Sequence, residues 1–275
     1  MSGRSGRSVN VLGRTVAIVE AAGGLVRAAS ARGLHLDRKN GGDLVTNADR
    51  EVDAFLKVEL RGILPAAWLS EESADDLDRL GREAVWIVDP LDGTREFAQG
   101  IAEYSIAVAL VEQGRPVLGV VHNPATGDSF WAARGGGAFR NGAPIRVNEG
   151  TILLASRSEV ATGEFVPLAD TWTLRPMGSV QLKLALVATA EGAVTLSRGP
   201  KHEWDVCAGA LIVAEAGGLA TDMFGSPLCY NQHWPKVKGI LAGAPAAYRR
   251  ALDQLGDIGP SRRMAEFADA FAPPS

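Results

Sequence analysis

The chain has 275 residues, of which 46% are hydrophobic and 22% charged, an ordinary composition for a globular protein. Its formal net charge of −4 gives no basic surface for a nucleic acid polymer, so we expect no such partner. No apolar run reaches the roughly 18 residues of a membrane-spanning helix, and two cysteines cannot build a disulfide framework. We therefore expect no integral membrane segment and a location in the reducing cytoplasm.

Two helices are predicted near the start of the chain. Residues 1–10 lack the apolar core of a signal peptide, and we expect them to form a disordered lead. Residues 9–31 show a helical pattern, in which Gly23-Gly24 indicates either a weak point or close packing. A second, amphipathic helix is predicted after Thr46 and Asp49, which are spaced like a capping box.

Carboxylates stand at the ends of the next two strand-like segments. The first segment runs into Glu71-Glu72, and the second, residues 85–88, ends at Asp89. Pro90 lacks a backbone donor, so we expect the strand to stop there. The following Asp92-Gly93-Thr94 adds a carboxylate, a flexible backbone and a hydroxyl. Oxygen ligands of this kind suit Mg²⁺, although an ordinary Asp-rich turn has the same local chemistry.

The rest of the chain predicts an antiparallel meander followed by alternating strands and helices. Composition changes little near residue 150, but there the predicted elements change from consecutive strands to strands that alternate with helices. We expect two tightly joined domains: an N-terminal α+β domain (1–150) with the antiparallel sheet, and a C-terminal α/β domain (151–275). After residue 104 we expect strands at 105–110, 116–122, 128–133, 152–156, 173–177, 193–197, 219–223 and 237–242, and helices at 163–172, 181–189, 204–216 and 245–255.

Asp205 is a further acidic residue at the edge of a predicted segment, the helix 204–216. As an N-cap it would accept backbone N–H groups and complement the helix dipole, which would explain it without any ligand. Alternatively, its second oxygen would face a cation held by the first domain. None of the four histidines has the spacing of a metal ligand. Spacing alone does not show that Asp205 converges with the acidic residues of the first domain.

Four stretches of the chain carry a resemblance that does connect these residues. They are Asp43-Leu-Val-Thr-x-x-Asp49, Ser70-Glu-Glu-Ser73, Trp86-Ile-Val-Asp-Pro-Leu-Asp-Gly-Thr94, and the stretch from Trp204-Asp205 to Gly217-Gly218. In this order they resemble the inositol monophosphatase superfamily of Mg²⁺-dependent, lithium-sensitive phosphomonoesterases. The resemblance implies a layered α/β/α/β/α sandwich, an α+β fold of the inositol monophosphatase/fructose-1,6-bisphosphatase type. It also implies a small phosphorylated substrate and a monomer or homodimer.

By the same resemblance, two to three Mg²⁺ ions would bind between the domains. Glu71, Asp89 and the carbonyl of Leu91 would hold one ion. Asp89, Asp92 and Asp205 would hold a second, and Glu71 with waters a weaker third.

The resemblance also implies catalytic and substrate-binding roles. Thr94, hydrogen-bonded to Asp49, would help Glu71 and the metals to orient and deprotonate the attacking water. Backbone N–H groups of Gly93 and Thr94 would receive the phosphate. The substrate contacts expected in total are Asp92, Gly93, Thr94, Gly178, Ser179, Lys183, Arg198 and Lys201.

The residues around these motifs favour a nucleotide as the substrate. Arg95-Glu96-Phe97 resembles the sequence found there in CysQ-type 3′(2′),5′-bisphosphate nucleotidases. Inositol-preferring relatives often place a glutamate where this chain has Arg198, and a guanidinium suits a second phosphate better than a sugar hydroxyl. Lys183 and Lys201 would add positive charge. We therefore expect hydrolysis of adenosine 3′,5′-bisphosphate to AMP and phosphate. The alternatives are an inositol-1-phosphate phosphatase and a weakly catalytic regulatory protein that binds metal or phosphate.

Overall fold

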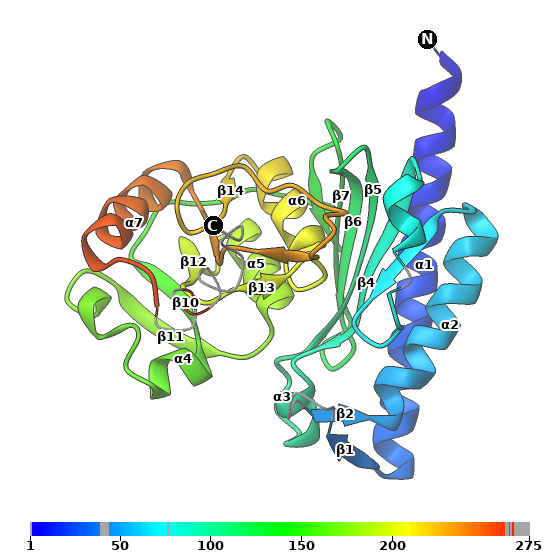
Figure 1. The fold of residues 1–275 in the computed structure, drawn as a ribbon, viewed down its shortest axis with the longest axis horizontal. Helices are drawn as coiled ribbons and strands as arrows, with labels where there is room; N and C mark the ends of the chain where they lie inside the picture. Colours follow the sequence, from blue (N-terminus) through cyan, green and yellow to red (C-terminus); the bar gives the residue numbers. More distant parts are fainter. Residues whose placement is uncertain (1, 39–43, 76, 262–263, 265, 267–275) are drawn as a thin grey trace, which may run out of the picture.

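The computed structural model describes the backbone of residues 2–38, 44–75, 77–261, 264 and 266. These residues form stacked layers: helices α1 and α2, a seven-stranded sheet, helices α5 and α6, a five-stranded sheet, and helix α7 (Figure 1). The layered α+β sandwich expected from the sequence is confirmed. Asp43, the first residue of the first motif, lies outside the described residues.

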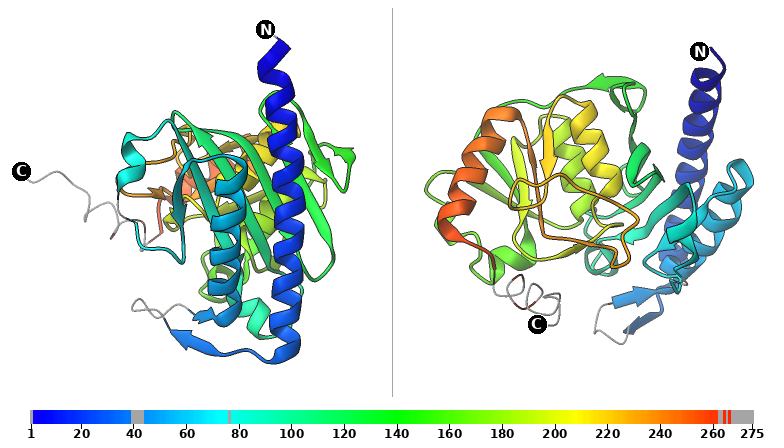
Figure 2. Two further views of the ribbon diagram at one scale, coloured as in Figure 1. Left: turned by 90° about the vertical axis from the view of Figure 1, so that its right-hand side faces the viewer. Right: turned by 45° about the horizontal axis from the view of Figure 1, so that its top comes forward.

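Helices α1 (Ser2–Arg32) and α2 (Asn47–Ile63) lie side by side on the outer face of the seven-stranded sheet (Figure 2). The helix begins at Ser2, so the expectation of a disordered lead is wrong for residues 2–10. Thr46 and Asp49 exchange the reciprocal hydrogen bonds of a capping box, as predicted. No helix in the described part of the chain is both long and apolar enough to cross a membrane.

The seven-stranded sheet is an antiparallel meander with one parallel edge, where β3 pairs with β4. Strand β4 continues to Asp92 and does not stop at Pro90 as predicted. The register against β5 shifts between Asp89 and Asp92, and this bulge removes Pro90 from the hydrogen-bonded ladder. The strands are β3 (Ala67–Ser70), β4 (Ala84–Asp92), β5 (Ser105–Glu112), β6 (Arg115–Asn123), β7 (Asp128–Ala133), β8 (Ala138–Arg140) and β9 (Ala143–Ile145).

The five-stranded sheet has the order β11-β10-β12-β16-β14; β10, β11 and β12 are parallel, and β16 is antiparallel to both of its neighbours, β12 and β14. The strand predicted at 237–242 is two strands, because β15 leaves the sheet to pair with β13. The strands are β10 (Ile152–Ser156), β11 (Thr173–Met177), β12 (Val194–Ser197), β13 (Lys201–His202), β14 (Leu219–Thr221), β15 (Lys236–Val237) and β16 (Ile240–Gly243). A separate antiparallel pair joins β1 (Leu36–Arg38) and β2 (Leu44–Thr46).

Helices α5 (Val180–Ala188) and α6 (Cys207–Glu215) fill the space between the two sheets. Nearly all their side chains are buried, which is why neither helix shows an amphipathic pattern. Helix α7 (Pro245–Ile258) covers the outer face of the five-stranded sheet. Short helices complete the fold: α3 (Thr94–Ala98), α4 (Arg157–Ala161), and the 3₁₀ helices η1 (Asp78–Gly81) and η2 (Val166–Leu168).

The prediction of a helix at 163–172 is wrong. Helix α4 ends before it, and the segment holds only η2 and turns. Gly163 has a φ of +79°, a left-handed conformation that ends a helix and does not continue one. The apolar residues that suggested a helix, such as Phe165 and Leu168, are instead single anchors buried against α7 and the five-stranded sheet.

Candidate active site

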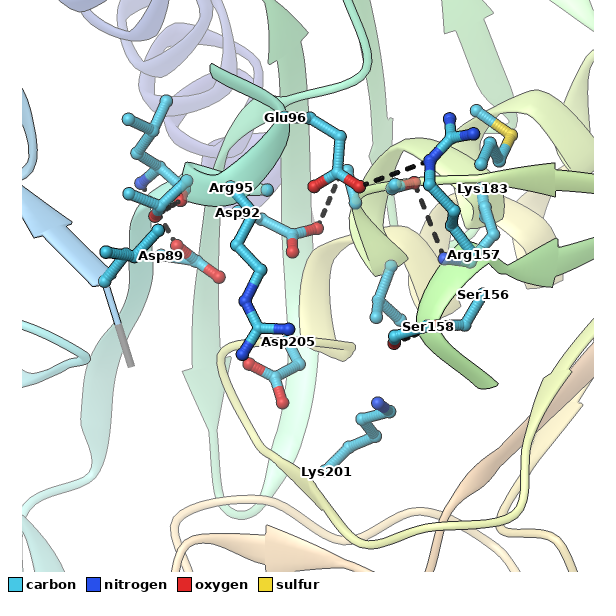
Figure 3. A pocket seen from close by; sticks show the side chains of 18 of the residues that line it. Asp89, Asp92, Arg95, Glu96, Ser156, Arg157, Ser158, Lys183, Lys201 and Asp205 are labelled. Carbon is cyan, nitrogen blue, oxygen red and sulfur yellow. Dashed lines mark hydrogen bonds and ion pairs between the residues drawn. The ribbon is translucent and has the colours of Figure 1, made fainter. Parts of the chain in front are cut away.

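A cavity of about 570 Å³ opens where the end of β4, helix α3, the start of α5 and the turn before α6 meet. Figure 3 shows its acidic and basic side chains facing a common space. The cavity wall includes most of the residues expected from the sequence, namely Glu71, Asp89, Leu91, Asp92, Gly93, Thr94, Gly178, Ser179, Lys183, Lys201 and Asp205. Asp49 lies behind this wall, and Arg198 is not part of it.

The bulge in β4 brings two carboxylates to the cavity. Asp89 is 1% exposed, and its Oδ1 accepts the backbone N–H of Leu91 at 3.1 Å. Asp92 Oδ2 accepts the hydroxyl of Ser179 and the backbone N–H of Gln181, both at 2.6 Å. Since Gln181 lies in the first turn of α5, a carboxylate there complements the helix dipole. Asp92 therefore joins the end of β4 to the second half of the chain.

Asp49 and Thr94 are paired, as the resemblance implied. Thr94 Oγ1 lies 3.0 Å from Asp49 Oδ1 and 3.0 Å from the carbonyl oxygen of Leu91. The second oxygen of Asp49 accepts the backbone N–H of Thr46 at 2.8 Å and its hydroxyl at 2.5 Å. The capping box of α2 thus holds Asp49 rigidly, and Asp49 in turn holds the Thr94 hydroxyl at the cavity wall.

Gly93 is required by the backbone at the turn between Asp92 and Thr94. Its φ is +95°, a conformation that side chains with a Cβ rarely adopt. A Cβ at this position would also lie 2.8 Å from the carbonyl oxygen of Glu103. The close approach of these two backbone segments sets the direction in which α3 begins.

The prediction that Asp205 caps α6 is wrong. The helix begins at Cys207 and its N-cap residue is Val206. Asp205 Oδ2 instead accepts the backbone N–H of His202 at 2.7 Å, within the turn before the helix. Helix capping therefore does not account for Asp205, whose carboxylate faces the cavity opposite the strand that carries Asp89 (Figure 3).

Three carboxylates of the cavity, Asp89, Asp92 and Asp205, have raised pKa values. Burial raises the pKa of Asp89 well above its ordinary value, and the neighbouring charges of Glu71, Asp92 and Asp205 raise it further. Burial also raises the pKa of Asp92, and that of Asp205 to about 7, with Glu71 again adding to the rise. These carboxylates repel one another in a medium that solvates their charge poorly.

The donor set fits a hard divalent cation in kind, because every acidic ligand offers oxygen and their repulsion is what a cation would relieve. Within the described residues, no three Asp, Glu, His or Cys side chains lie close enough to form a closed metal cage. The residues available to hold a cation are therefore the separate cavity carboxylates and the carbonyl of Leu91.

Basic side chains line another side of the cavity (Figure 3). Lys183 is 3% exposed, and burial lowers the pKa of its amino group to about 8. Lys201 Nζ lies 3.7 Å from Glu159 Oε1. Arg157 forms ion pairs with Glu103 and, at 3.7 Å, with Glu96. Sequence reasoning missed Ser156, Arg157 and Ser158; their signal was their position at the end of the predicted strand 152–156 and directly after it.

Arg198 is not brought into the cavity. Its side chain is buried, and its guanidinium donates to the carbonyl oxygens of Glu164 at 3.2 Å and Gly259 at 2.9 Å. These bonds attach the C-terminal segment to the five-stranded sheet. The phosphate contact expected of Arg198 therefore has no support in the structure.

Comparisons with known proteins agree with this site. The sequence profile of the inositol monophosphatase family matches residues 10–256. A fructose-1,6-bisphosphatase/inositol-1-monophosphatase of Thermotoga maritima is 37% identical over 203 residues, covering 70% of this chain and 76% of that protein. A 3′(2′),5′-bisphosphate nucleotidase CysQ of Aggregatibacter actinomycetemcomitans is 29% identical over 239 residues, covering 82% and 89%. The crystal structure of the extragenic suppressor protein suhB of Bartonella henselae, 29% identical, superposes with a TM-score of 0.77 over 90% of this chain and 97% of that one.

The fold, the acidic cavity and these matches define a phosphoric monoester hydrolase. The chain belongs to the inositol monophosphatase family. This family is metal-dependent, which agrees with the chemistry of the carboxylates at the end of β4.

Proposed function

We propose that the chain is a Mg²⁺-dependent 3′(2′),5′-bisphosphate nucleotidase that converts adenosine 3′,5′-bisphosphate to AMP and phosphate. It would act in the cytoplasm as a monomer or homodimer. The observation that carries the proposal is the buried lysine, Lys183, in the same cavity as the carboxylates. The carboxylates suit cations at the scissile phosphate, and a cationic wall suits a second phosphate of the substrate. With Arg198 directed elsewhere, Lys183 and Lys201 carry this argument.

Each acidic residue has a role in the proposed site. Glu71, Asp89 and the carbonyl of Leu91 would hold one Mg²⁺; Asp89, Asp92 and Asp205 would hold a second, and Glu71 with waters a weaker third. When bound, Mg²⁺ neutralises charge on the phosphoryl oxygens and lowers the pKa of the attacking water.

The chain itself positions the water and the phosphate. Asp49 fixes the hydroxyl of Thr94, which is 3.0 Å away, and this pair acts with Glu71 to orient the water and take its proton. The backbone N–H groups of Gly93 and Thr94, at the start of α3, receive the phosphate. Gly178 and Ser179 border the substrate, and Ser179 also holds Asp92 in place.

Inositol-1-phosphate hydrolysis is the second candidate, and two observations favour it. Glu96 lies in the cavity wall, and its carboxylate is a good acceptor for sugar hydroxyls. The relative from Thermotoga maritima, 37% identical, is named a fructose-1,6-bisphosphatase/inositol-1-monophosphatase, so inositol-1-phosphatase activity is part of its name. A weakly catalytic binding protein is the third possibility.

A Mg²⁺-dependent phosphate-release assay separates these candidates. We expect kcat/KM to be highest for adenosine 3′,5′-bisphosphate, lower for inositol-1-phosphate, and both activities to be inhibited by Li⁺. The reverse order would establish the second candidate, and no turnover the third. We expect Asp89→Asn to reduce kcat by at least about 10²-fold, because it removes a charge that holds the cation. Circular dichroism would show that the variant is folded, and full activity in this variant would refute the metal assignment.

A further inference from the structure

Arg79 is a buried arginine in the charged segment between β3 and β4. It lies in η1, and its side chain is 0% exposed. Burying a guanidinium is costly unless its charge and its N–H groups are matched. Asp75 matches the charge, since its two oxygens accept Arg79 Nε at 3.0 Å and Nη2 at 2.7 Å. Arg79 Nη1 donates to Asn231 Oδ1 at 2.8 Å, a residue 152 positions away in the chain.

Asn231 returns this bond and belongs to the other half of the molecule. Its Nδ2 donates to the carbonyl oxygen of Arg79 at 3.1 Å, so the two residues hold each other by two hydrogen bonds. Asn231 lies in the segment between β14 and β15, which reaches from the five-stranded sheet across to the seven-stranded sheet (Figures 1 and 2). The backbone N–H of the preceding Tyr230 also donates across this boundary, to the carbonyl oxygen of Gly114 at 3.1 Å.

From Asn231 the hydrogen bonds continue to the turn that carries Asp205. The backbone N–H groups of Asn231 and Gln232 donate to the two oxygens of Glu203, at 2.7 and 2.8 Å. Glu203 is 0% exposed, and its carbonyl oxygen accepts the N–H of Cys207, the first residue of α6. Asp205 stands between Glu203 and Cys207, so its position follows that of this turn.

At the other end, a separate pair of hydrogen bonds holds the segment that carries Glu71. Asp53, on α2, accepts the hydroxyls of Ser70 at 2.5 Å and Ser73 at 2.7 Å, one on each side of Glu71-Glu72. Asp75, the carboxylate paired with Arg79, follows Ser73 by two residues. Hydrogen bonds therefore run from Asp75 through Arg79 and Asn231 to the Asp205 turn, and the short backbone stretch 73–75 joins Asp75 to the Glu71 segment.

We propose that Arg79 and Asn231 form a brace that fixes the separation of Glu71 and Asp205 and so sets the affinity of the site for divalent cations. The proposal rests on the proposed function, in which these two carboxylates bind cations of one centre. Both brace residues are positioning residues. The two carboxylates come from different halves of the molecule and repel each other, so a rigid contact is needed to keep them in place for a cation.

Asn231→Gly tests the brace with little effect elsewhere. Asn231 has a φ of +60°, a conformation that glycine adopts freely, and glycine retains the backbone N–H that binds Glu203. The variant therefore loses only the side-chain bonds to Arg79. We expect isothermal titration calorimetry without substrate to show Mg²⁺ affinity reduced about tenfold, the size of effect seen when residues that orient metal ligands are changed. The kcat at saturating Mg²⁺ is expected to stay within about twofold of wild type, since the reacting groups are intact.

Two further variants complete the experiment. Arg82→Met removes an exposed arginine three residues further along and is expected to leave Mg²⁺ affinity unchanged. Arg79→Met combined with Asn231→Gly is expected to weaken binding no more than Arg79→Met alone, because both changes break one contact. If Arg79→Met does not fold, Asn231→Gly alone decides.

The outcomes separate the brace from the proposed function. If the wild type is active and Mg²⁺-dependent, and Asn231→Gly binds Mg²⁺ with the same affinity, the brace is refuted while the proposed function stands. A loss of affinity in Arg82→Met equal to that in Asn231→Gly also overturns it. A wild type that binds no Mg²⁺ and hydrolyses no phosphate ester overturns the proposed function, and the brace with it.

Discussion

Lys183 is a cationic side chain that is almost fully buried in the cavity wall, 3% exposed. Burial is the main reason that its pKa falls to about 8, and the positive charge of Lys201 lowers it further, while Asp92 opposes the change. A lysine with a lowered pKa is charged below that pKa and neutral above it. Near neutral pH, Lys183 is therefore charged and able to bind a phosphate, but its charge is lost as the pH rises through about 8.

We expect kcat/KM for adenosine 3′,5′-bisphosphate to fall as the pH rises through about 8, because kcat/KM reports ionisation of the free enzyme. Lys183→Met is expected to reduce kcat/KM about 10- to 100-fold below pH 8, the cost of losing one charged hydrogen bond to phosphate. It should also remove the alkaline fall. Adenosine 3′-monophosphate, which lacks the second phosphate, is the matched control; an equal effect of Lys183→Met on both substrates would contradict the assignment.

At the residue scale, local motifs predicted the acidic residues well and the basic ones poorly. Asp49, Asp89 and Thr94 each have a hydrogen-bond partner two or three positions away, so their neighbours in sequence partly fix their geometry. The bond between Thr94 and Asp49 spans 45 positions and was expected only from the resemblance. Arg198 differs, because the carbonyl groups that take its guanidinium lie 34 and 61 positions away. Nothing in the sequence indicates that these carbonyls compete with a phosphate for the same donors.

At the scale of elements, helix α1 packs closely on the buried ring of His122 in β6. Gly23 is the contact point, because a Cβ there would collide with the ring. His122 Nδ1 lies 2.9 Å from Ser129 Oγ, which donates its own proton to Glu20 on α1 at 2.7 Å. The hydroxyl must then accept from Nδ1–H. Nε2 is buried without a hydrogen-bond partner among the described residues, and burial lowers the pKa of the ring, so near neutral pH Nε2 carries the lone pair.

We predict that His122 makes the attachment of α1 sensitive to acid. Burial lowers the pKa of His122 below its ordinary 6.5, and Arg27 adds to this effect, while Glu20 and Asp128 oppose it. The unfolded chain therefore binds a proton more readily than the folded protein. Stability from this residue is present above about pH 6.5 and is lost as the pH falls through the lowered pKa.

Urea unfolding with saturating Mg²⁺, at several values between pH 5.5 and 7.5, measures this dependence. Wild type is expected to lose unfolding free energy toward pH 5.5. His122→Asn retains a donor near Ser129 but cannot be protonated, so its loss should be smaller, even though it costs about 1–2 kcal/mol at neutral pH through lost packing. His233→Asn changes an exposed histidine and serves as the control. A wild-type slope in His122→Asn would contradict the prediction.

Element boundaries were less predictable than the elements themselves, and each error has a physical cause. Pro90 does not end β4, because a bulge takes it out of the ladder. Helix α6 begins two residues after Asp205, because the carbonyl oxygen of Glu203 accepts from Val206 and Cys207 and closes the turn first. In both cases a tertiary contact or a neighbouring strand outweighs the local preference of a single residue.

At the scale of the whole molecule, the site exists only where the two halves meet. Asp89 and Asp92 come from the seven-stranded sheet, Asp205 from the turn before α6. Asp205 lies more than a hundred residues after Asp89 and Asp92, so periodicity and spacing do not reveal that the three carboxylates converge. Only the resemblance of several motifs, taken together, predicted this. The layered fold is predictable in the same way, whereas the cross-connection through Arg79 and Asn231 follows no motif and required the structure.

Because its ligands come from both halves, a bound cation should stabilise the molecule as a whole. Mg²⁺ at 100 times its dissociation constant is expected to add about 2.7 kcal/mol to the unfolding free energy, which corresponds to a rise in Tm of roughly 5–10 °C for a chain of this size. Differential scanning calorimetry with and without Mg²⁺ measures this rise. Glu112→Gln, a change at an exposed carboxylate at the end of β5, should show the same rise as wild type.

Asp89→Asn should reverse the order of stabilities. Without Mg²⁺ we expect this variant to melt above the metal-free wild type, because it removes one of several buried charges that repel one another and keeps an oxygen for the N–H of Leu91. With Mg²⁺ it should lose most of the rise in Tm, because residue 89 would no longer offer a charged carboxylate to the cations. A metal-free variant that melts below wild type would show that Asp89 stabilises the fold directly. An undiminished Mg²⁺ effect would show that the cation binds elsewhere on the molecule.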